Sequence, residues 1–585
     1  MITRRDLLAR GVTIAGGALV APGAAQALTR RRARVWALPQ TAIAPDADQL
    51  AALRVLGRTT MRMPGTLPNA ALAAGTDTIP QIEHVVVLMM ENHSYDNFLG
   101  MLGRGPFETP RGDGFTIEAA DGYPANSNPQ SDGTPLRAFP MPTDCQLSGK
   151  PSQEWTASHE QYAGGRNNGF VTSPSGPVAM GYWDRAEIPF TYSLASHFPV
   201  GDRYFCSVLG QTDPNRRYLI AATSSGMTDD IPDPSQTATL GVTPPGGTIF
   251  NHLSEAGISW AEYDVQYKQV TSETMNLYPA SDGVYDQTNE RSFAQFLSDA
   301  KAGSLPAFSL VDPNFSTQSQ ENPQNIAIGE QFMRAVVEAI GSSPKWDKTI
   351  LFISYDEHGG YYDHVPPPVA LAPDDVPPVT NSPSQSSYDG FKRYGFRVPC
   401  IVVSPYAKRS YVSHVVYDHT SVLAFVERKW NLPAMTLRDA NANDMTDFLD
   451  LGAMAAGRPT FPELPKLAAS ADGLPVGKCS VPYKGKVPPA SRPAPLPVRV
   501  RVDYEGVHHH AATLRLQASR GTLRGLIVEL RRRDDVIARH RISTLSVVPR
   551  EVLLRVHGRA PAAGHYTVAV LHGHRTLTRR RIHIR

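Results

Sequence analysis

Long apolar runs and cysteine are both scarce in this chain. After residue 27 no segment approaches the roughly 18 uninterrupted apolar residues that a membrane-spanning helix needs, so we expect the rest of the chain to be soluble. The 585 residues include only four cysteines, and none has the spacing of a zinc-cysteine site. There is also no internal repeat. These absences argue against a membrane-embedded protein, a cysteine-ligated zinc domain and a repeat protein.

The first 27 residues, MITRRDLLARGVTIAGGALVAPGAAQA, have the features of an export signal. Arg4 and Arg5 form a pair, a mildly apolar run extends from Gly11 to Ala21, and small residues precede a cleavage point after Ala27. This order is typical of a twin-arginine signal, and the alternative is an ordinary basic N-terminus. We therefore predict a protein that is secreted or located in the cell envelope after twin-arginine export.

Four cysteines in an exported chain permit up to two disulfides. Cys400 lies within the apolar run VPCIVV and is expected to be a buried free thiol. Cys145 and Cys479 stand in loop-like surroundings and are expected to form a bridge.

Charge is distributed unevenly along the chain. Residues 496–585 hold 18 arginines, no lysine and six acidic residues, which gives this region a net charge of +12. Residues 28–495 carry a net charge of −12. The basic region is explained either by a solvated arginine-rich surface or by attraction to anionic lipid or a cell-envelope polymer. We predict peripheral membrane or envelope contact and no nucleic-acid partner.

The pattern of apolar residues predicts an α/β domain followed by a β domain. Strand-like runs at 82–90, 305–311, 349–355 and 398–404 alternate with helical patterns, which favours a mainly parallel sheet. After a proline-rich linker, short alternating runs separated by glycine or proline predict a small β-sandwich. The expected division is a signal (1–27), an N-terminal arm (28–78), an α/β domain (79–484), a linker (485–497) and a basic β-sandwich (498–585).

Acidic or amide side chains follow three of the predicted strands: Glu91 and Asn92, Asp312 and Asn314, and Asp356 and Glu357. Parallel strands bring their carboxyl ends to one edge of a sheet, where ligands bind in α/β proteins. Carboxylates gathered there would repel one another unless a cation lay between them. Oxygen ligands suit Mg²⁺, Ca²⁺ or Mn²⁺, whereas the nearby His358 and His364 would also admit zinc or iron.

The stretch GQTDPNRRYL predicts a helix that begins at Thr212. Pro214 in the first turn and the residues before it are typical of a helix start. Unpaired N–H groups at such a terminus attract a phosphate, and Asn215 and Arg216 are candidates for additional donors. A metal that also contacts Thr212 would lower the pKa of its hydroxyl and favour attack on phosphorus. The alternative is a simple helix cap.

Five ordered motifs, ENHSYDNFLG, GQTDPNRRYL, DEHGGYYDHVPPP, GFRVPCIVVSPYA and DHTSVLAFVERKW, resemble the bacterial phosphoesterase family of phospholipases C and acid phosphatases, within the alkaline-phosphatase-like superfamily. The resemblance covers about residues 80–435 and implies an α/β/α core. It implies a divalent metal (Ca, Mg, Mn or Zn) held by Glu91, Asn92, Asp356 and Glu357, with Thr212 as metal-bound nucleophile.

His159 and His419 also fall in family motif positions, which makes them candidates for phosphate binding or proton transfer. We therefore expect an exported phospholipase C that acts through a phosphothreonine. The alternatives are an acid phosphatase on the same site and a non-catalytic envelope-binding protein. Aromatic faces can hold a quaternary ammonium group, and this favours phosphatidylcholine as the substrate. The candidate aromatic residues are Trp155, Tyr162, Tyr182, Trp183, Tyr361 and Tyr362, for which core packing is the other explanation.

Overall fold

The computed structural model describes residues 44–104, 110–118, 122–142, 144–146, 151–230, 244–265, 288–380, 382–469, 500–518, 523–533, 535–546, 548–572 and 575–584. The predicted signal (1–27), part of the predicted arm, the predicted linker (485–497) and Cys479 lie outside these ranges. Among the described helices, none combines the length and apolar character that crossing a membrane requires.

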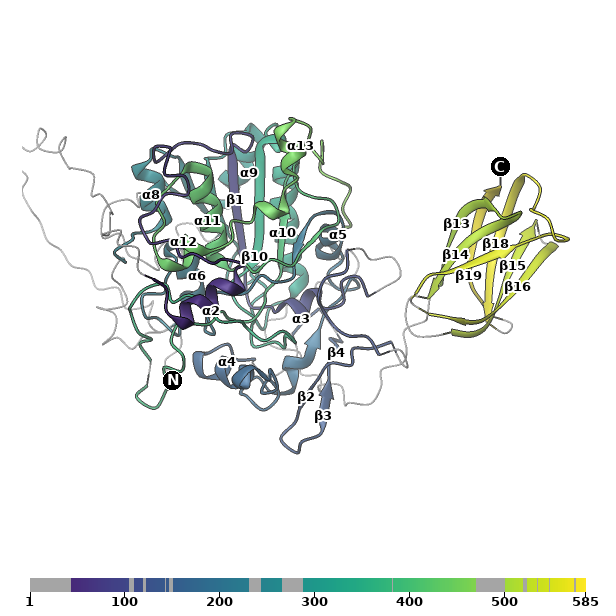
Figure 1. Ribbon diagram of the computed structural model, residues 1–585, viewed down its shortest axis with the longest axis horizontal. Coiled ribbons are helices and arrows are strands. Elements are labelled where there is room, and N and C mark those ends of the chain that lie inside the picture. The colour runs from purple at the N-terminus through teal and green to yellow at the C-terminus, as the bar shows by residue number, and fades with distance from the viewer. Residues whose placement is uncertain are drawn as a thin grey trace, which may run out of the picture. The chain divides into compact units, whose positions relative to one another are not determined.

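A mixed, mostly parallel sheet forms the centre of the larger body (Figure 1). Its strands, in spatial order, are β12 (Val412–Ser413), β6 (Val200–Gly201), β11 (Cys400–Val403), β10 (Thr349–Tyr355), β1 (His84–Met90), β9 (Phe308–Asp312), β7 (Trp260–Asp264) and β8 (Glu290–Ser292). β1 runs parallel to β9 and β10, whereas β11 runs antiparallel to β10. All seven residues of β1 are buried, as expected for a strand covered on both faces. The predicted α/β class is confirmed.

Helices cover both faces of this sheet. In Figure 1, α6 (Thr212–Ala221), α8 (Ile249–Glu255), α11 (His419–Trp430) and α12 (Leu437–Asn441) lie on one side of β1 and β10. On the other side are α5 (Pro189–His197) and α10 (Ile326–Gly341), and α9 (Phe293–Ala302) packs against α10. The Phe352 ring of β10 packs 5.1 Å from Phe425 of α11. This contact fixes α11 over the strand that precedes Asp356.

Shorter elements complete the larger body: α2 (Ala47–Val55), α3 (Tyr95–Leu99), α4 (Trp155–Tyr162), α13 (Leu451–Ala455), β2 (Ser127–Pro129), β3 (Pro135–Arg137), β4 (Phe139–Pro140) and β5 (Gly181–Tyr182). α3 begins directly after the polar residues that end β1, and the Asn97 N–H in its first turn donates to the Ser94 side chain. The segment between β1 and α3 is therefore held at both ends.

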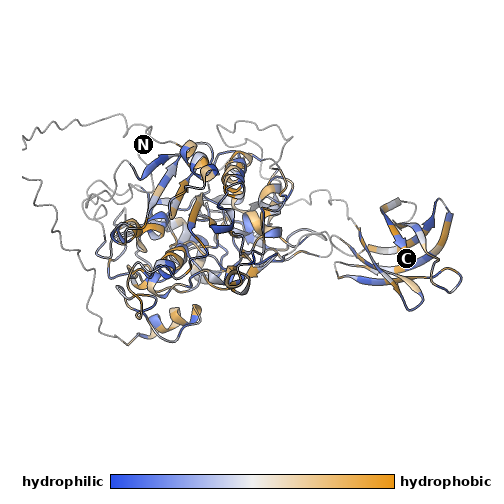
Figure 2. Cartoon of the chain, turned by 90° about the horizontal axis from the view of Figure 1, so that it is seen from above, coloured by the Kyte–Doolittle hydropathy of each residue, from blue (hydrophilic) through white to orange (hydrophobic). Residues whose placement is uncertain are grey.

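The C-terminal body is a sandwich of two antiparallel sheets. One sheet has the order β13 (Val500–His508), β14 (Ala511–Ala518), β17 (Arg550–Leu554), and the other has β16 (Asp535–Leu545), β15 (Leu523–Arg532), β18 (Gly564–His572), β19 (Arg575–Ile584). Alternate apolar residues of both sheets form one core. Figure 2 shows hydrophobic and hydrophilic residues interspersed along these strands. The predicted β-rich C-terminal region is confirmed, and the domain boundaries remain predictions.

The cysteines agree in part with expectation. Cys400 and Cys206 are buried free thiols, as predicted for Cys400. Cys145 is disulfide-bonded. Its predicted partner, Cys479, lies outside the described residues.

Candidate active site

The ends of β1 and β10 lie side by side and carry four of the predicted site residues. Met90 pairs with Tyr355 at the last register position, and the Asp356 N–H donates to the Met90 carbonyl at 3.0 Å. Glu91 and Asn92 therefore leave the sheet next to Asp356 and Glu357. All four side chains are at most 3% exposed.

Backbone geometry locks these two segments together. Asn92 has a left-handed backbone (φ 68°), and its N–H donates to Asp356 Oδ1 at 2.9 Å. The Glu357 N–H donates to the same oxygen at 2.7 Å. Gly359 passes so close that a Cβ there would lie 1.9 Å from the Asn92 carbonyl oxygen, so no larger residue fits. The position of one carboxylate oxygen of Asp356 is thus fixed by two N–H groups.

Three polar atoms at this point remain unsatisfied. Asp356 Oδ2, Glu357 Oε1 and Asn92 Nδ2 are buried and have no well-formed hydrogen bond within the part of the chain that the structure describes. Burial raises the pKa of Asp356, against the opposing effect of the Arg216 charge. Burial and the Asp356 carboxylate raise the pKa of Glu357 well above its ordinary value. Such a group is costly without a cation, and its oxygen-rich composition fits a hard divalent ion.

Thr212 lies beside this carboxylate group. It is the first residue of α6, its exposed fraction is 7%, and its hydroxyl is close enough to Asp356 to lower the pKa of that carboxyl group. The sequence prediction placed Thr212 at a helix N-terminus, and the helix begins at this residue. The structure therefore brings the Thr212 hydroxyl to Asp356, which also accepts from the Asn92 N–H of the segment that follows β1.

Asn215 holds the loop in front of Thr212. Its Oδ1 accepts from the Ser207 and Val208 N–H groups at 2.8 and 3.1 Å. Its Nδ2 donates to the carbonyl oxygens of Gly210 and Gln211 at 3.1 and 2.9 Å. The sequence suggested Asn215 as a donor to phosphate, but the amide is already bonded to its own loop. We assign it a positioning role.

Arg216 contacts the neighbouring acids. Its Nη1 donates to Asp312 Oδ1 at 3.1 Å, its Nη2 donates to the Met89 carbonyl at 3.2 Å, and the same Nη2 is 3.6 Å from Glu91 Oε1. Arg216 and Asp312 are completely buried. The Arg216 Nε also lies 4.0 Å from Asp356 Oδ2, so one guanidinium is shared among three acids and is nearest to Asp312.

Two of the predicted histidines adjoin the acids. His419 Nε2 donates to the Asp356 carbonyl at 2.6 Å, and its Nδ1 accepts from the Tyr204 hydroxyl at 3.1 Å. His358 Nε2 is 2.6 Å from Gln161 Oε1, and its Nδ1 is 3.2 Å from Glu357 Oε2. Burial lowers the pKa of each histidine to about 3. Both are therefore neutral near pH 7, and His419 positions Asp356.

His159 occupies a different environment. It lies on α4, where its Nδ1 donates to the Trp155 carbonyl at 2.7 Å and its ring stacks on Tyr388 at 3.9 Å. Burial lowers the pKa of His159 to about 4. Within the described ranges, none of its hydrogen bonds or ring contacts is with Thr212 or the four acid and amide residues. A role for His159 in phosphate binding remains a prediction.

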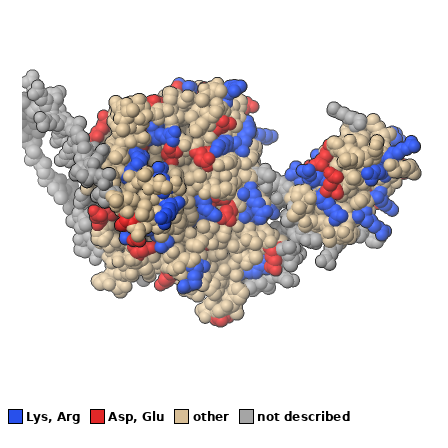
Figure 3. All heavy atoms as spheres, in the orientation of Figure 1, with Lys and Arg blue, Asp and Glu red and all other residues tan. Residues whose placement is uncertain are grey.

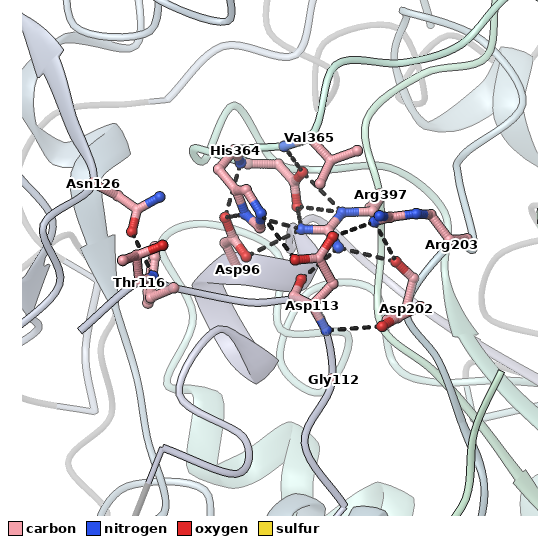
Figure 4. A network of polar contacts seen from close by, with 12 residues as sticks. Asp96, Gly112, Asp113, Thr116, Asn126, Asp202, Arg203, His364, Val365 and Arg397 are labelled. Carbon is pink, nitrogen blue, oxygen red and sulfur yellow. Dashed lines mark hydrogen bonds and ion pairs between the residues drawn. The ribbon is translucent and has the colours of Figure 1, made fainter. Parts of the chain in front are cut away.

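A second acidic cluster contains His364, which the sequence grouped with His358. Asp96, Asp363 and His364 each offer one ligand atom within 4.8 Å of the others, so they form a possible metal-binding cluster (Figure 4). His364 Nδ1 is 2.7 Å from Asp96 Oδ2, and its Nε2 is 3.3 Å from Asp113 Oδ1. Although burial disfavours the charged ring, the Asp96 carboxylate raises the pKa of His364 to about 10.

Arg397 lies at the centre of this cluster. Its guanidinium donates to Asp363 Oδ1 at 2.9 Å and to Asp96 Oδ1 at 3.1 Å, and it also donates to the carbonyl oxygens of Asp113 and Asp202. Arg397, Asp96 and Asp363 are completely buried. The two cations of the cluster, Arg397 and protonated His364, balance the charges of Asp96 and Asp363.

The residues of this cluster had no predicted role except His364. Asp96, Asp363 and Arg397 all lie inside quoted motifs, but nothing in the motifs shows which acid faces an arginine. One signal in the sequence was proximity to the predicted site residues: Asp96 lies four residues after Asn92, and Asp363 lies six residues after Glu357. Tyr204, which orients His419, carried no signal of this kind.

The structure favours core packing for most of the six aromatic residues that were candidates for contact with a choline head group. Five of its six members are at most 8% exposed and belong to the core: Trp155, Tyr182, Trp183, Tyr361 and Tyr362. Tyr162 is partly buried, and its ring stacks with the Arg393 guanidinium 4.6 Å away. The five buried side chains pack within hydrophobic clusters of the core, which favours the packing explanation for them.

Comparison with known proteins gives a consistent result. Residues 82–433 match the model of the Phosphoesterase family. Phospholipase C B of Mycobacterium tuberculosis (strain ATCC 25618 / H37Rv) is 29% identical over 482 residues, covering 73% of this chain and 91% of the relative. Non-specific phospholipase C1 of Arabidopsis thaliana is 31% identical over 389 residues, covering 61% of this chain and 69% of the relative.

A solved structure described as a protein in the alkaline phosphatase superfamily from Vibrio parahaemolyticus is also similar. The sequence identity is 11%, the TM-score is 0.34, and the match covers 69% of this chain and 79% of that chain.

Proposed function

Because the chain belongs to the Phosphoesterase family, as its motifs indicated, we propose that it is a metal-dependent phospholipase C. Curated relatives from a bacterium and a plant carry that name, which supports a phosphoric ester hydrolase of this type. The observation that carries the mechanism is the position of the Thr212 hydroxyl, at the start of α6 and beside a buried acid group with unsatisfied atoms.

The residues present fit a divalent metal ion. The residues that would hold it are Glu91, Asn92, Asp356, Glu357 and Thr212, which combine carboxylate, amide and hydroxyl oxygens. Two of these oxygens, Asp356 Oδ2 and Glu357 Oε1, have no well-formed hydrogen bond among the described residues. When bound, the ion supplies a lowered pKa for the threonine hydroxyl and neutralises charge on the phosphoryl oxygens. The second cluster is a poorer candidate because Arg397 and His364 already balance its acids.

The chain's own residues carry out two displacement steps. The Thr212 oxygen attacks phosphorus, a threonine O–P bond forms, and the P–O bond to glycerol breaks. The threonine proton ends on the departing glycerol oxygen, so diacylglycerol leaves. Water then attacks the phosphothreonine, releases the phosphorylated head group and restores the hydroxyl. The N-terminus of α6 favours the anionic phosphoryl group throughout.

A two-substrate assay tests the reaction class. We expect hydrolysis of phosphatidylcholine to exceed that of an aryl phosphate monoester, and both activities to disappear with a chelator and return with a divalent ion. Preference for the monoester would instead establish an acid phosphatase on the same site. Inactivity on both substrates with tight lipid binding would favour a non-catalytic envelope protein. Phosphatidylcholine is the first substrate to test, although the buried aromatic residues no longer support that choice.

The nucleophile has a separate test. Acid quench during turnover should trap the phosphorylated head group on Thr212 as a phosphodiester, and peptide mapping locates it. Thr212→Val should abolish the adduct and reduce turnover by about 1,000-fold or more, equivalent to about 4 kcal/mol of transition-state stabilisation. Thr212→Ser, which keeps a hydroxyl, is the matched control and should still form an adduct. Near-normal turnover of Thr212→Val would show that another group attacks phosphorus.

We also propose twin-arginine export, supported by Arg4, Arg5 and the small residues that end at Ala27. Replacing both arginines with lysine should retain the protein in the cytoplasm of an expressing bacterium. Fractionation and immunoblotting measure this, and unchanged export would contradict the assignment.

A further inference from the structure

The outer face of the four-stranded C-terminal sheet is strongly basic. Cross-strand pairing places Arg539, Glu529, Ala569 and Arg579 in one row across β16, β15, β18 and β19. Side chains in such a row share a face of the sheet. Leu526, Val528 and Leu530 alternate with this row and point into the core, so the row faces outward.

Neighbouring rows repeat the pattern. One contains Arg541, Ile527 and Leu571, and another contains Arg531, Thr567 and Arg581. The face therefore carries five arginines: Arg531, Arg539, Arg541, Arg579 and Arg581. Figure 3 shows arginine side chains in several places on the visible side of the C-terminal body.

The acid in the middle of this face is already neutralised. Glu529 is 3% exposed and is bonded by Arg531 at 2.5 Å and by Arg539 at 2.8 Å. The side chains of Arg541, Arg579 and Arg581 are exposed on the two outer strands. These three arginines supply charge that Glu529 does not balance.

Beside the paired Glu529 and Arg531, the two central strands present apolar side chains on this face. Ile527 and Leu571 are half-buried, and Ala569 is buried. β16 and β19 are separated by three strand spacings, which is roughly 14 Å. Exposed arginines on the two outer strands, with partly exposed apolar side chains between them, match a bilayer surface, where phosphates contact the arginines and the apolar side chains meet the interface. A soluble polyanion would be better bound by charges that converge on a groove.

The opposite sheet provides an internal comparison. Its outer face mixes Arg501 and Arg515 with Asp503, Glu505 and Glu551. Arg501 pairs with Asp503 at 2.5 Å, and Arg515 pairs with Glu505 at 2.9 Å. Positive charge is therefore concentrated on one face of the sandwich and balanced on the other.

We propose that the outer face of the β16–β15–β18–β19 sheet docks the protein onto an anionic phospholipid bilayer. This inference adds a membrane-docking surface to the proposed phospholipase. The choice of lipid as the partner rests on that proposed function. The face brings the enzyme to its substrate surface, while the chemistry remains with Thr212 and the acids of the larger body.

Vesicle binding by the full chain tests this proposal without requiring turnover. The Thr212→Val background prevents hydrolysis, and cosedimentation is measured with vesicles of phosphatidylglycerol and phosphatidylcholine in equal parts and with phosphatidylcholine alone. Since each basic residue near an anionic surface contributes about 1 kcal/mol, the triple variant R541Q/R579Q/R581Q should bind the anionic vesicles about 100-fold more weakly.

The control R501Q/R515Q/R555Q also removes three positive charges, but from the other sheet. Its third residue, Arg555, directly follows β17. It should lose less than about threefold, since the two sheets lie roughly 10 Å apart and salt screens over a similar distance. Equal losses in both variants would overturn the proposal in favour of bulk charge. No binding of the parent protein to anionic vesicles, or tight binding to a soluble anionic polysaccharide but not to vesicles, would also overturn it.

The activity of these variants with native Thr212 separates the two proposals. Both triples should hydrolyse a short-chain, monomeric phospholipid at the parent rate. If vesicles bind through the basic face but no phospholipid is hydrolysed, the phospholipase proposal fails and the docking surface stands.

Discussion

Two buried acidic clusters follow the same strands, and they differ in how their charge is balanced. Around Asp96 and Asp363, the protein supplies Arg397 and a protonated His364. Around Asp356 and Glu357, one oxygen of each carboxylate has no well-formed hydrogen bond among the described residues. The first arrangement is complete as a structural support. In our proposal an added cation completes the second. The difference would then separate a structural cluster, here called the clip, from a reactive centre.

Mutations in the two clusters should therefore have different effects, although both clusters consist of buried acids. Breaking the clip should cost stability, because it leaves a buried charge without its partner. Neutralising an acid of the reactive centre should cost activity but little stability, because that acid is already poorly compensated in the metal-free protein.

The largest expected effect is loss of activity in Glu357→Gln. The glutamine oxygen can still accept from the Gly359 N–H, which now donates to Glu357 Oε2 at 2.7 Å. Removing the charge should reduce kcat/KM by about 1,000-fold or more, because roughly 4 kcal/mol of transition-state stabilisation is lost. Chemical denaturation with chelator present should show unchanged or increased stability. A strongly destabilised variant would place Glu357 in a structural role instead.

Arg397→Met should produce the largest loss of stability. Asp96 and Asp363 would remain buried without their main cation, and we expect the free energy of unfolding to fall by about 3–5 kcal/mol in urea titrations. Arg393→Met is a matched control, because Arg393 pairs with Asp389 near the surface at 2.9 Å. That control should lose less than about 1 kcal/mol. Similar losses in both variants would show that the clip has no special energetic role.

A smaller effect is expected from His419→Gln. The histidine bonds the Asp356 carbonyl and the Tyr204 hydroxyl, so it orients the acid without contacting substrate. Loss of this type of support reduces metal affinity or activity by about 10–100-fold. Tyr204→Phe should have a weaker effect in the same direction. Steady-state kinetics at several metal concentrations measure both variants, and a normal metal dependence would contradict the positioning role.

The last expected effect is a change in the pH dependence of stability. Because the folded pKa of His364 is raised to about 10, its contribution is full below its ordinary pKa near 6.5 and is lost as pH rises towards 10. The difference in unfolding free energy between the parent protein and His364→Gln should therefore shrink over this interval. A constant difference from pH 6.5 to 10 would show that His364 does not change charge there.

The strands and the helix that carry the candidate site could be predicted from the sequence. The apolar run before Glu91 and the run before Asp356 identify two strands, and their carboxyl ends meet as expected. The start of the helix at Thr212 was also readable from Pro214 and its neighbours. These features depend on local periodicity and on the geometry of parallel sheets, which are encoded in short segments.

The separation of the two clusters could not be predicted in the same way. Asp356 and Asp363 lie in one motif, but Arg397, 34 residues beyond Asp363, bonds only the second of them. The aromatic residues show the same difficulty, because Trp183 and Tyr361 were candidates for contact with a head group but pack against each other and are buried. Partners of this kind are set by tertiary packing.

Metal analysis of dialysed protein tests the central claim most directly. The parent protein, Glu357→Gln and Asp363→Asn are equilibrated with the same mixture of Mg²⁺, Ca²⁺, Mn²⁺ and Zn²⁺, and the bound metal is measured by mass spectrometry alongside a check of folding. We predict that the parent and folded Asp363→Asn retain metal, whereas Glu357→Gln loses it. Retention by Glu357→Gln together with loss from folded Asp363→Asn would place the metal in the other cluster and contradict the account.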